Sequence, residues 1–173
     1  FYPDIQGDYK YYFIPNYPSK IFYKHFDKNW KPGEDIRLIF QGSIGDFHAL
    51  ENILPLLKMK FGNSGLQLIL KGGVRPDYKK KLDSLAEFYG VSDRVFWAGI
   101  GSYYELKFLT ASCHIGIGVH FADDDVRKTL GTASNKIYEY AACGLPVVLY
   151  DNDQFRKYLS AYDWAFFTDG TTA

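Results

Sequence analysis

The chain has 173 residues, of which 47% are apolar and 18% aromatic, and this suits a single globular domain with a sizeable core. Twenty basic residues balance twenty acidic ones, whereas nucleic-acid-binding proteins carry a basic excess, so no nucleic-acid partner is expected. No signal peptide opens the sequence, and the longest apolar run, around residues 140–150, is too short to span a bilayer.

Residues 1–35 are rich in Tyr, Pro and Asn. One short strand is expected at Tyr11–Ile14, after which Pro15, Pro18 and Pro32 interrupt regular structure. We interpret 1–35 as a connector between domains whose aromatic side chains pack on a folded partner. The sequence begins at Phe1 without Met and stops on "FFTDGTTA", so we expect a piece cut from a longer protein.

From Arg37 onward, short apolar runs alternate with stretches of helical spacing. The runs are "RLIF", "LQLIL", "RVFWA", "HIGIGV", "PVVLY" and "WAFF". Continuous apolar runs indicate strands that are buried on both faces. Strand–helix alternation predicts a parallel sheet with helices on both sides. The predicted fold class is therefore α/β, a Rossmann-like doubly wound sheet of about six strands over residues 36–173.

The stretches between these runs carry helix signals. Leu50, Ile53, Leu54 and Leu57 follow a helical period, although Pro55 should kink this helix or shift its start. A second helix is expected to begin at Pro76 and end at Gly90. Ser102 and Glu105 have the spacing of a capping box, which predicts a third helix. Cys113 and Cys143 lie in apolar surroundings and are expected to be buried free thiols of a reducing compartment.

Sheets of this kind bind ligands at the carboxyl ends of their strands, which directs attention to the loops that follow each run. In "QGSIG", Gly42, Ser43 and Gly45 could let the backbone approach a phosphate, although an ordinary tight turn explains the same pattern. Lys71 in "KGG" could stand at the rim of the site or simply be solvated. Asp123–Asp125 are interpreted as solvated acids, and no metal site is expected.

The four histidines have no metal-ligand spacing and no Ser–His–Asp arrangement is visible. His114 lies in a strand pattern and is interpreted as a core residue. His120 follows that strand and is interpreted as a surface residue, although its place at the strand end allows ligand contact.

The stretch "SNKIYEYAACGLPVV", residues 134–148, combines an anion site with a carboxylate. Ser134 is a natural N-cap, and Asn135 and Glu139 share one helical face at a spacing of four residues. Free N–H groups at the helix start attract a diphosphate, and both oxygens of Glu139 can accept from the two hydroxyls of a ribose. An exposed helical glutamate would show the same periodicity.

This stretch resembles the signature of family 4 retaining glycosyltransferases with the GT-B fold. Segments "IRLIFQGSIGDFHALENILPLL", "LQLILKGG" and "VSDRVFWAGIGSYYELKFLTASCHIGIGV" resemble, in the same order, the first four strands of the C-terminal donor-binding domain of that family. "YYFIPNYP" resembles the segment that joins its two domains. The resemblance therefore extends over nearly the whole chain.

The resemblance implies that Glu139 binds ribose, that Asn135 and Lys136 hold the diphosphate, and that Gly42–Gly45 border the donor. It places the loop Ala98–Ser102, with Gly99, near the base. The family's acidic motif would need Glu at position 131, which is Gly131, and the usual cations after the first strand are missing, since that segment offers only His48. The phosphate charge must then be met by other cations. The candidates are Lys71, Arg127, Lys128 and Lys136.

The resemblance implies the donor half of a retaining hexosyltransferase that uses a nucleoside diphosphate sugar and no metal. Its acceptor would be a lipid-linked or polysaccharide chain of the cell envelope, its N-terminal acceptor-binding domain would precede Phe1, and the domain alone would be inactive. The enzyme would be cytoplasmic or peripheral at the inner face of the membrane. A non-catalytic doubly wound nucleotide-binding module and a GT-B epimerase half remain alternatives. A receiver domain would need acids after the first strand, where Gln41 and Gly42 stand.

Overall fold

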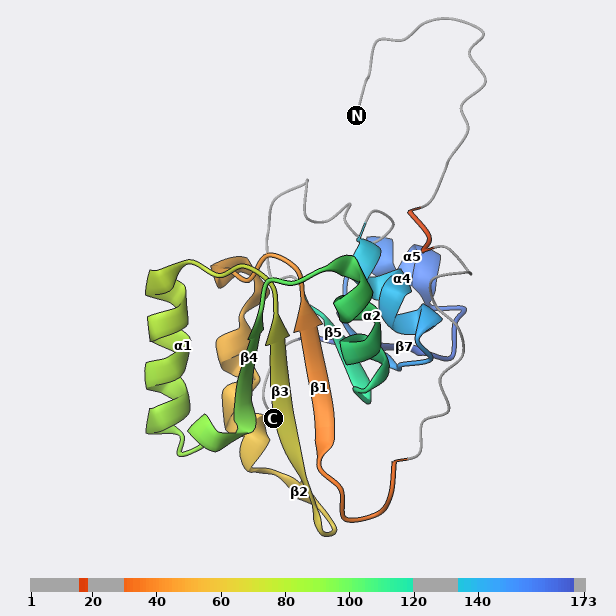
Figure 1. Cartoon of the computed structure of the whole chain (residues 1–173). Helices are drawn as coiled ribbons and strands as arrows, with labels where there is room; N and C mark the ends of the chain where they lie inside the picture. The colour runs from red at the N-terminus through yellow and green to blue at the C-terminus, as the bar shows by residue number, and fades with distance from the viewer. Residues whose placement is uncertain (1–15, 19–29, 120–133, 170–173) are drawn as a thin grey trace, which may run out of the picture.

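The structure, a computed structural model, describes residues 16–18, 30–119 and 134–169 and contains a mostly parallel sheet with helices on both faces (Figure 1). Six strands pair in parallel, and each coincides with one of the predicted apolar runs. In spatial order they are β4 (Val95–Gly99), β3 (Ser64–Lys71), β1 (Ile36–Gln41), β5 (Ile115–Gly118), β6 (Val147–Tyr150) and β7 (Ala165–Thr168). The predicted fold class is confirmed.

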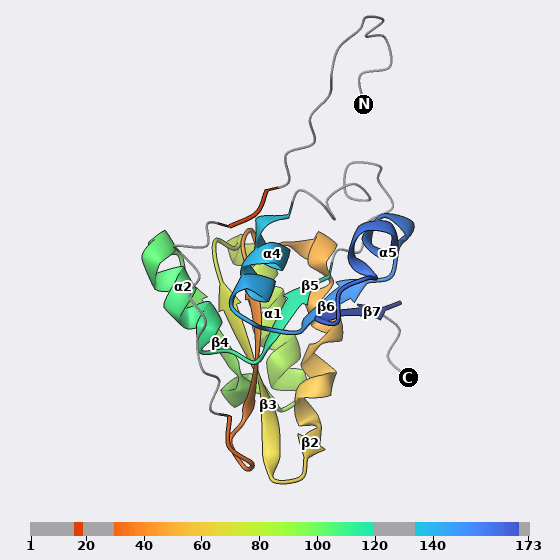
Figure 2. The same cartoon turned by 90° about the vertical axis from the view of Figure 1, so that its right-hand side faces the viewer.

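Alternate residues of the central strands face opposite cores, which is the packing of a doubly wound sheet. Leu38 and Phe40 of β1 belong to a cluster with the helix α1 (Pro76–Phe88), whereas Ile39 between them belongs to a second cluster with α4 (Asn135–Ala142) and α5 (Asp153–Leu159). Figure 2 shows α2 (Tyr103–Ala111) on one side of the sheet and the 3-10 helices of residues 46–58 on the other. This two-sided burial explains why the strands read as continuous apolar runs.

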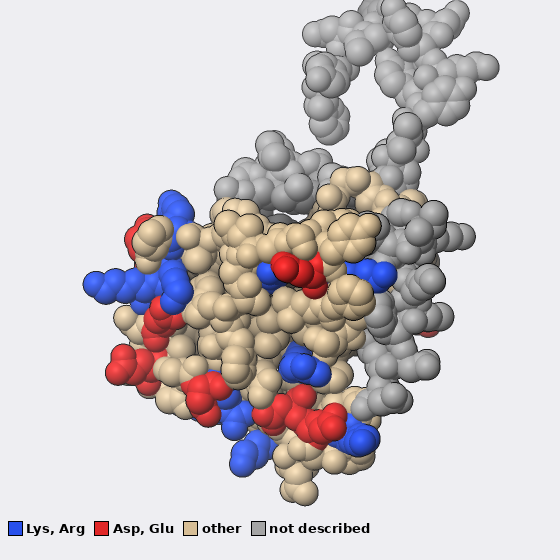
Figure 3. Space-filling model, viewed as in Figure 1, with Lys and Arg blue, Asp and Glu red and all other residues tan. Residues whose placement is uncertain are grey.

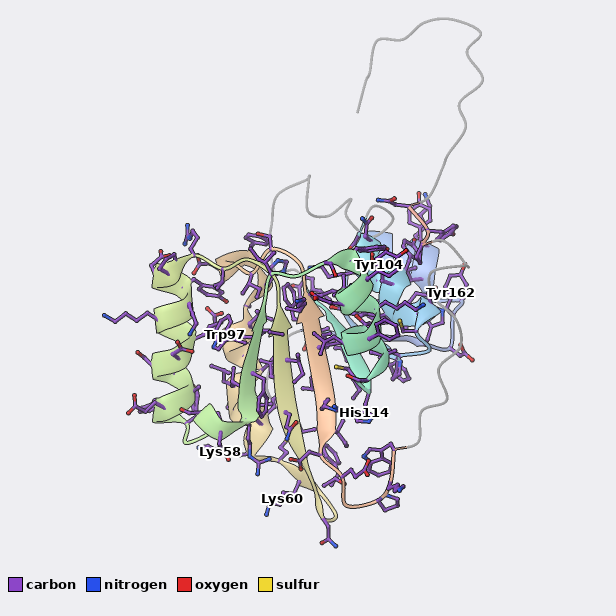
Figure 4. The ribbon with its side chains drawn as sticks, in the orientation of Figure 1. Lys58, Lys60, Trp97, Tyr104, His114 and Tyr162 are labelled. Atoms are coloured by element: carbon purple, nitrogen blue, oxygen red, sulfur yellow. The ribbon has the colours of Figure 1, made fainter. Side chains whose placement is uncertain are left out.

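Local signals set several helix ends as predicted. Pro76 is the first residue of α1, and Gly90 follows the helix with a φ of 66°, a value that glycine adopts without strain. Ser102 and Glu105 form the expected capping box at the start of α2. Trp97 of β4 lies beside α1 (Figure 4) and donates a hydrogen bond of 2.8 Å to Asp83.

The helix predicted from the spacing of Leu50 to Leu57 is wrong in type. The chain instead forms three 3-10 helices: η1 (Asp46–His48), η2 (Leu50–Asn52) and η3 (Leu54–Lys58). Ala49 has a left-handed φ of 44°, and Pro55 has no N–H to donate, so no continuous α-helical ladder can form. The leucines still reach the core, because a 3-10 period of three brings Leu54 and Leu57 to one side.

Other elements were not predicted. The short strand β2 (Lys60–Phe61) pairs antiparallel with the start of β3, and the 3-10 helix η4 (Ser92–Arg94) precedes β4.

Both cysteines are buried and free, as expected. Over the described residues no helix has the length and apolar character that a membrane span requires. Basic and acidic side chains are interspersed on the face in Figure 3, in keeping with the zero net charge.

Of the connector, the structure describes residues 16–18 and 30–35. The ring of Tyr17 packs edge-on against Tyr138 of α4 at a centroid distance of 4.7 Å, so this aromatic residue packs on the domain as expected. The strand predicted at Tyr11–Ile14 lies outside the described residues.

Candidate functional site

The loops that follow β1, β3 and β4 meet through backbone hydrogen bonds at the carboxyl end of the sheet. Gly42 N–H donates to the carbonyl of Lys71 at 2.9 Å, and Gly72 N–H donates to the carbonyl of Gly99 at 3.0 Å. A Cβ on Gly72 would lie 1.8 Å from the carbonyl oxygen of Gly42, and the φ of Gly72 is 141°. Only glycine permits this approach, so the three loops form one continuous backbone surface.

Two cavities open on this surface, and Gly42 and Leu106 line both of them. The larger cavity, of about 810 Å³, lies between the loops and the start of α2. The smaller one, of about 390 Å³, lies at the start of α4. Of the predicted site residues, the larger is lined by Gly42, Ser43, Lys71 and Gly99, and the smaller by Gly42, Ser134, Asn135, Lys136 and Glu139.

Not every predicted residue belongs to these cavities. Gly45 is buried, extends the backbone into η1 and lines neither of them. Asp123–Asp125, Arg127, Lys128 and His120 lie outside the described residues. A third cavity, of about 620 Å³, lies beside α1 and β4 and is lined by none of the predicted residues.

Glu139 is a buried carboxylate that lines the smaller cavity. Glu139 is only 5% exposed, so the alternative interpretation as an exposed helical glutamate is wrong. The side-chain amide of Gln41 donates to Oε2, and the hydroxyl of Tyr103 donates to Oε1 at 2.9 Å. A buried carboxylate needs such donors, because an unpaired charge inside a protein is strongly destabilising.

The neighbouring Tyr140 attaches α4 to the end of β1. Its hydroxyl accepts a hydrogen bond of 2.8 Å from the backbone N–H of Gln41. Complete burial raises the pKa of Tyr140 well above its ordinary value, so the phenol stays neutral. One strand end thus holds two consecutive residues of α4: the backbone of Gln41 binds Tyr140, and its side chain binds Glu139.

The first residues of α4 line the smaller cavity. Ser134 occupies the N-cap position as predicted, but its side chain makes no capping hydrogen bond, so the expected cap interaction is absent. Asn135 is exposed and accepts a hydrogen bond from the side chain of Asn16. The helix start therefore has a backbone N–H that no side-chain cap satisfies, in a position suited to an anion.

Lys136 brings an unusual cation to this cavity. Its Nζ lies 4.1 Å from the centroid of the Phe40 ring, and no carboxylate of the described residues lies within ion-pair distance of it. Burial lowers the pKa of Lys136 from 10.5 to about 7, against an opposing effect of the nearby Glu139 charge. A Cβ on Gly42 would lie 3.7 Å from this amine, so Lys136 reaches the loop after β1.

Lys71 lies within the site rather than at a solvated rim. It is 9% exposed, and its Nζ donates a hydrogen bond of 3.2 Å to the carbonyl of Ala98. The amine would lie 2.6 Å from a Cβ on Gly101, so the glycine leaves room for it. Lys71 faces the larger cavity and Lys136 the smaller one, on either side of Gly42.

The two described histidines make hydrogen bonds to the backbone near the sheet. His48 is 2% exposed, and its ring nitrogens lie 2.9 Å from the carbonyl oxygen of Ser43 and 3.2 Å from that of Val119. It therefore braces the loop after β1 against β5 rather than facing either cavity. His114 precedes β5 and accepts from the backbone N–H of Arg37 at 2.9 Å, but it is only half-buried, so its role is structural without being that of the core residue that was predicted.

Gln41, Tyr103 and Thr110 join the site although the sequence did not assign them a role there. Gln41 is a buried polar residue that closes the apolar run "RLIFQ", and a polar residue at the carboxyl end of such a strand is a signal for a site. Tyr103 and Thr110 carried no comparable signal, because their sequence context explains them as ordinary helix residues.

The comparisons with known proteins give the family. The model of the family described as glycosyl transferases group 1 matches residues 20–173. A comparison with curated protein sequences gave no match.

Solved structures share the fold at low identity. A crystal structure of Anabaena HepE in complex with UDP and glucose is 17% identical, with a TM-score of 0.61 over 78% of this chain and 34% of that one. WaaG, a glycosyltransferase involved in lipopolysaccharide biosynthesis, is 17% identical, with a TM-score of 0.59 over 79% of this chain and 34% of that one. The C-terminal domain of LpcC from Francisella tularensis is 14% identical, with a TM-score of 0.64 over 87% and 79%.

The chain thus spans about a third of the length of HepE and WaaG and most of the isolated C-terminal domain of LpcC. Its fold is that of the C-terminal domain of a GT-B glycosyltransferase. Together with the match over residues 20–173, this shows that the chain belongs to the glycosyl transferases group 1 family.

Proposed function

We propose that this chain binds the nucleoside diphosphate sugar donor of a retaining glycosyltransferase that transfers a hexose to a lipid-linked or polysaccharide acceptor of the cell envelope. The observation that carries the proposal is the place of Glu139, a buried carboxylate one helical turn from the open start of α4. A ribose on Glu139 places its diphosphate at this helix start and leaves its base for the larger cavity.

The two lysines give the site a means to stabilise the leaving group. The diphosphate of the donor gains negative charge as the bond to the sugar breaks, and positioned N–H groups and cations lower the energy of that state. The α4 start and Lys136 face the smaller cavity, and Lys71 faces the larger one. The chemistry proposed here needs no metal ion, because these groups supply the positive charge.

Nucleotide titration of the 173-residue chain tests the proposal. UDP is the first probe, because HepE was crystallised with UDP, and ADP and GDP complete the panel. We expect calorimetry to show saturable binding of one nucleoside diphosphate, with the same affinity in chelator and in magnesium. Failure of all three to bind would contradict the proposed donor site. Binding that is lost in chelator and again on Asp123→Ala would contradict the metal-free mechanism.

Sugar transfer should need more chain than these residues. In this proposal, the chain forms one side of the active-site cleft, and the acceptor-binding domain forms the opposite side. We expect the 173-residue chain to bind the donor without transferring its sugar to an acceptor. Transfer of labelled sugar by this chain alone would contradict the two-domain arrangement.

A further inference from the structure

The two hydrogen bonds on Glu139 differ in how firmly their donors are held. Gln41 is 2% exposed, and its Oε1 lies 2.8 Å from the hydroxyl oxygen of Thr110, which is fully buried. The Thr110 hydroxyl also lies 2.7 Å from the carbonyl oxygen of Leu106, so its one proton is shared between these two acceptors. An ionised carboxylate can only accept, so the amide nitrogen of Gln41 must face Glu139 and the amide oxygen must face Thr110. The Gln41 side chain is therefore fixed at both ends.

Tyr103, which donates to Oε1 of Glu139, lies in a more exposed environment than Gln41. It is 46% exposed, it is the first residue of α2, and its side chain lines the larger cavity. Rotation of its ring toward solvent exchanges the hydrogen bond between the Tyr103 hydroxyl and Glu139 Oε1 for hydrogen bonds to water. Rotation of Gln41 would instead remove the buried donor of Glu139 Oε2, while the Thr110 hydroxyl would keep the carbonyl of Leu106 as its acceptor at 2.7 Å.

We propose that Gln41 is a positioning residue that orients Glu139 permanently, and that the Tyr103 hydroxyl is a placeholder that a ribose hydroxyl displaces from Oε1. The inference rests on the proposed function, since it takes Glu139 as the ribose acceptor. Gln41 fixes the rotation of the carboxylate through Oε2, so that Oε1 faces the hydroxyl of Tyr103, a residue that lines the larger cavity. Tyr103 satisfies Oε1 until the nucleoside arrives.

The first arm of the test measures how well the site discriminates UDP from 2′-deoxy-UDP, as the ratio of their dissociation constants by calorimetry. If the panel shows that another base binds, its nucleotide pair replaces these probes. The ratio within one variant cancels any general loss of stability. We expect the parent to favour the ribonucleotide by about ten-fold or more, and Gln41→Leu to bring the ratio close to one, because without Gln41 the carboxylate is free to rotate and Oε1 no longer meets the ribose hydroxyl.

Matched variants separate positioning from the mere loss of a glutamine. Gln67→Leu removes the glutamine of β3 that donates to Asp35 at 2.9 Å, away from both cavities, and should keep the parent ratio. Thr110→Val keeps the size of the side chain but removes the donor behind Gln41, and should lower the ratio part of the way. If Gln41→Leu and Thr110→Val both keep the parent ratio, Gln41 does not position Glu139.

The second arm tests the placeholder. Tyr103→Phe keeps the ring in the wall and removes the hydroxyl that competes for Oε1. We expect it to bind UDP about 3- to 10-fold more tightly than the parent, since no hydrogen bond has to be given up. Unchanged or weaker binding of UDP would overturn the placeholder role. If the parent itself binds no nucleotide, the proposed function fails, a result that differs from a parent that binds with a ratio insensitive to Gln41.

Discussion

The amine of Lys136 lies 4.1 Å from the centroid of the Phe40 ring, near the carboxyl end of β1 and beside Gly42. An aromatic face attracts a cation but forms no ion pair, and burial brings the pKa of Lys136 to about 7. The amine of Lys136 is therefore partly protonated at neutral pH, and a bound anion would give it an ion-pair partner.

Diphosphate binding should draw a proton onto this amine. At pH 8 most of the free Lys136 is neutral, and a bound diphosphate favours the charged form, because opposite charges raise the pKa of a lysine. We expect the apparent binding enthalpy of UDP to differ between Tris and HEPES at pH 8, by up to about one proton per UDP.

Lys136→Met should abolish this buffer dependence, whereas Lys157→Met, on the exposed face of α5, should retain it. Equal buffer dependence in the parent and Lys136→Met would mean that another group takes up the proton.

The same amine should make stability depend on pH. Its pKa is lowered from 10.5 to about 7, so between these values the native state binds fewer protons than the unfolded state, and stability rises with pH. Below pH 7 the full cost of burying the charge is present. Lys136→Met removes this cost, so its gain in melting temperature should be larger at pH 6 than at pH 9. A gain that is the same at both pH values would contradict the lowered pKa.

Glu139→Gln should weaken ribonucleotide binding by about ten- to a hundred-fold, because a carboxylate contributes about 1.5–3 kcal/mol as a hydrogen-bond acceptor. The loss should be smaller for the 2′-deoxynucleotide, which lacks one of the two hydroxyls. Calorimetric titration of both ligands measures this difference. A charge effect on the phosphates would act equally on both ligands and would strengthen binding when the negative charge is removed. Unchanged ribonucleotide binding would contradict the role of Glu139.

Gly72→Ala should destabilise the site and the fold together. The new Cβ would lie 1.8 Å from the Gly42 carbonyl at a φ of 141°, so both loops must move, at an expected cost above about 3 kcal/mol. Gly62→Ala is the matched control: its φ is 61° and no atom lies within 4 Å of the added Cβ, so only about 1 kcal/mol is expected. Chemical denaturation measures both. Similar losses of unfolding free energy in the two variants would show that backbone strain, and not the close approach to Gly42, causes the destabilisation.

Local chemistry predicted most of the fold. The six apolar runs became the six parallel strands, and the capping box at Ser102 began α2, because these signals act over a few residues. The stretch from Leu50 to Leu57 was predicted as a helix from its apolar period, and that period could not tell an α-helix from successive 3-10 turns. Pro55 was the one local feature that argued against a regular α-helix. The left-handed backbone of Ala49, which the sequence did not predict, interrupts the helix as well.

The sequence by itself determined that Glu139 would follow a helix start by one turn, since helical geometry depends only on neighbouring residues. Only the tertiary structure decided that this carboxylate is buried. Its hydrogen-bond donors come from Gln41 and Tyr103, which are 98 and 36 residues away along the chain. Helical periodicity carries no information about such partners, because the sheet pairing and the crossover connections bring β1, α2 and α4 together.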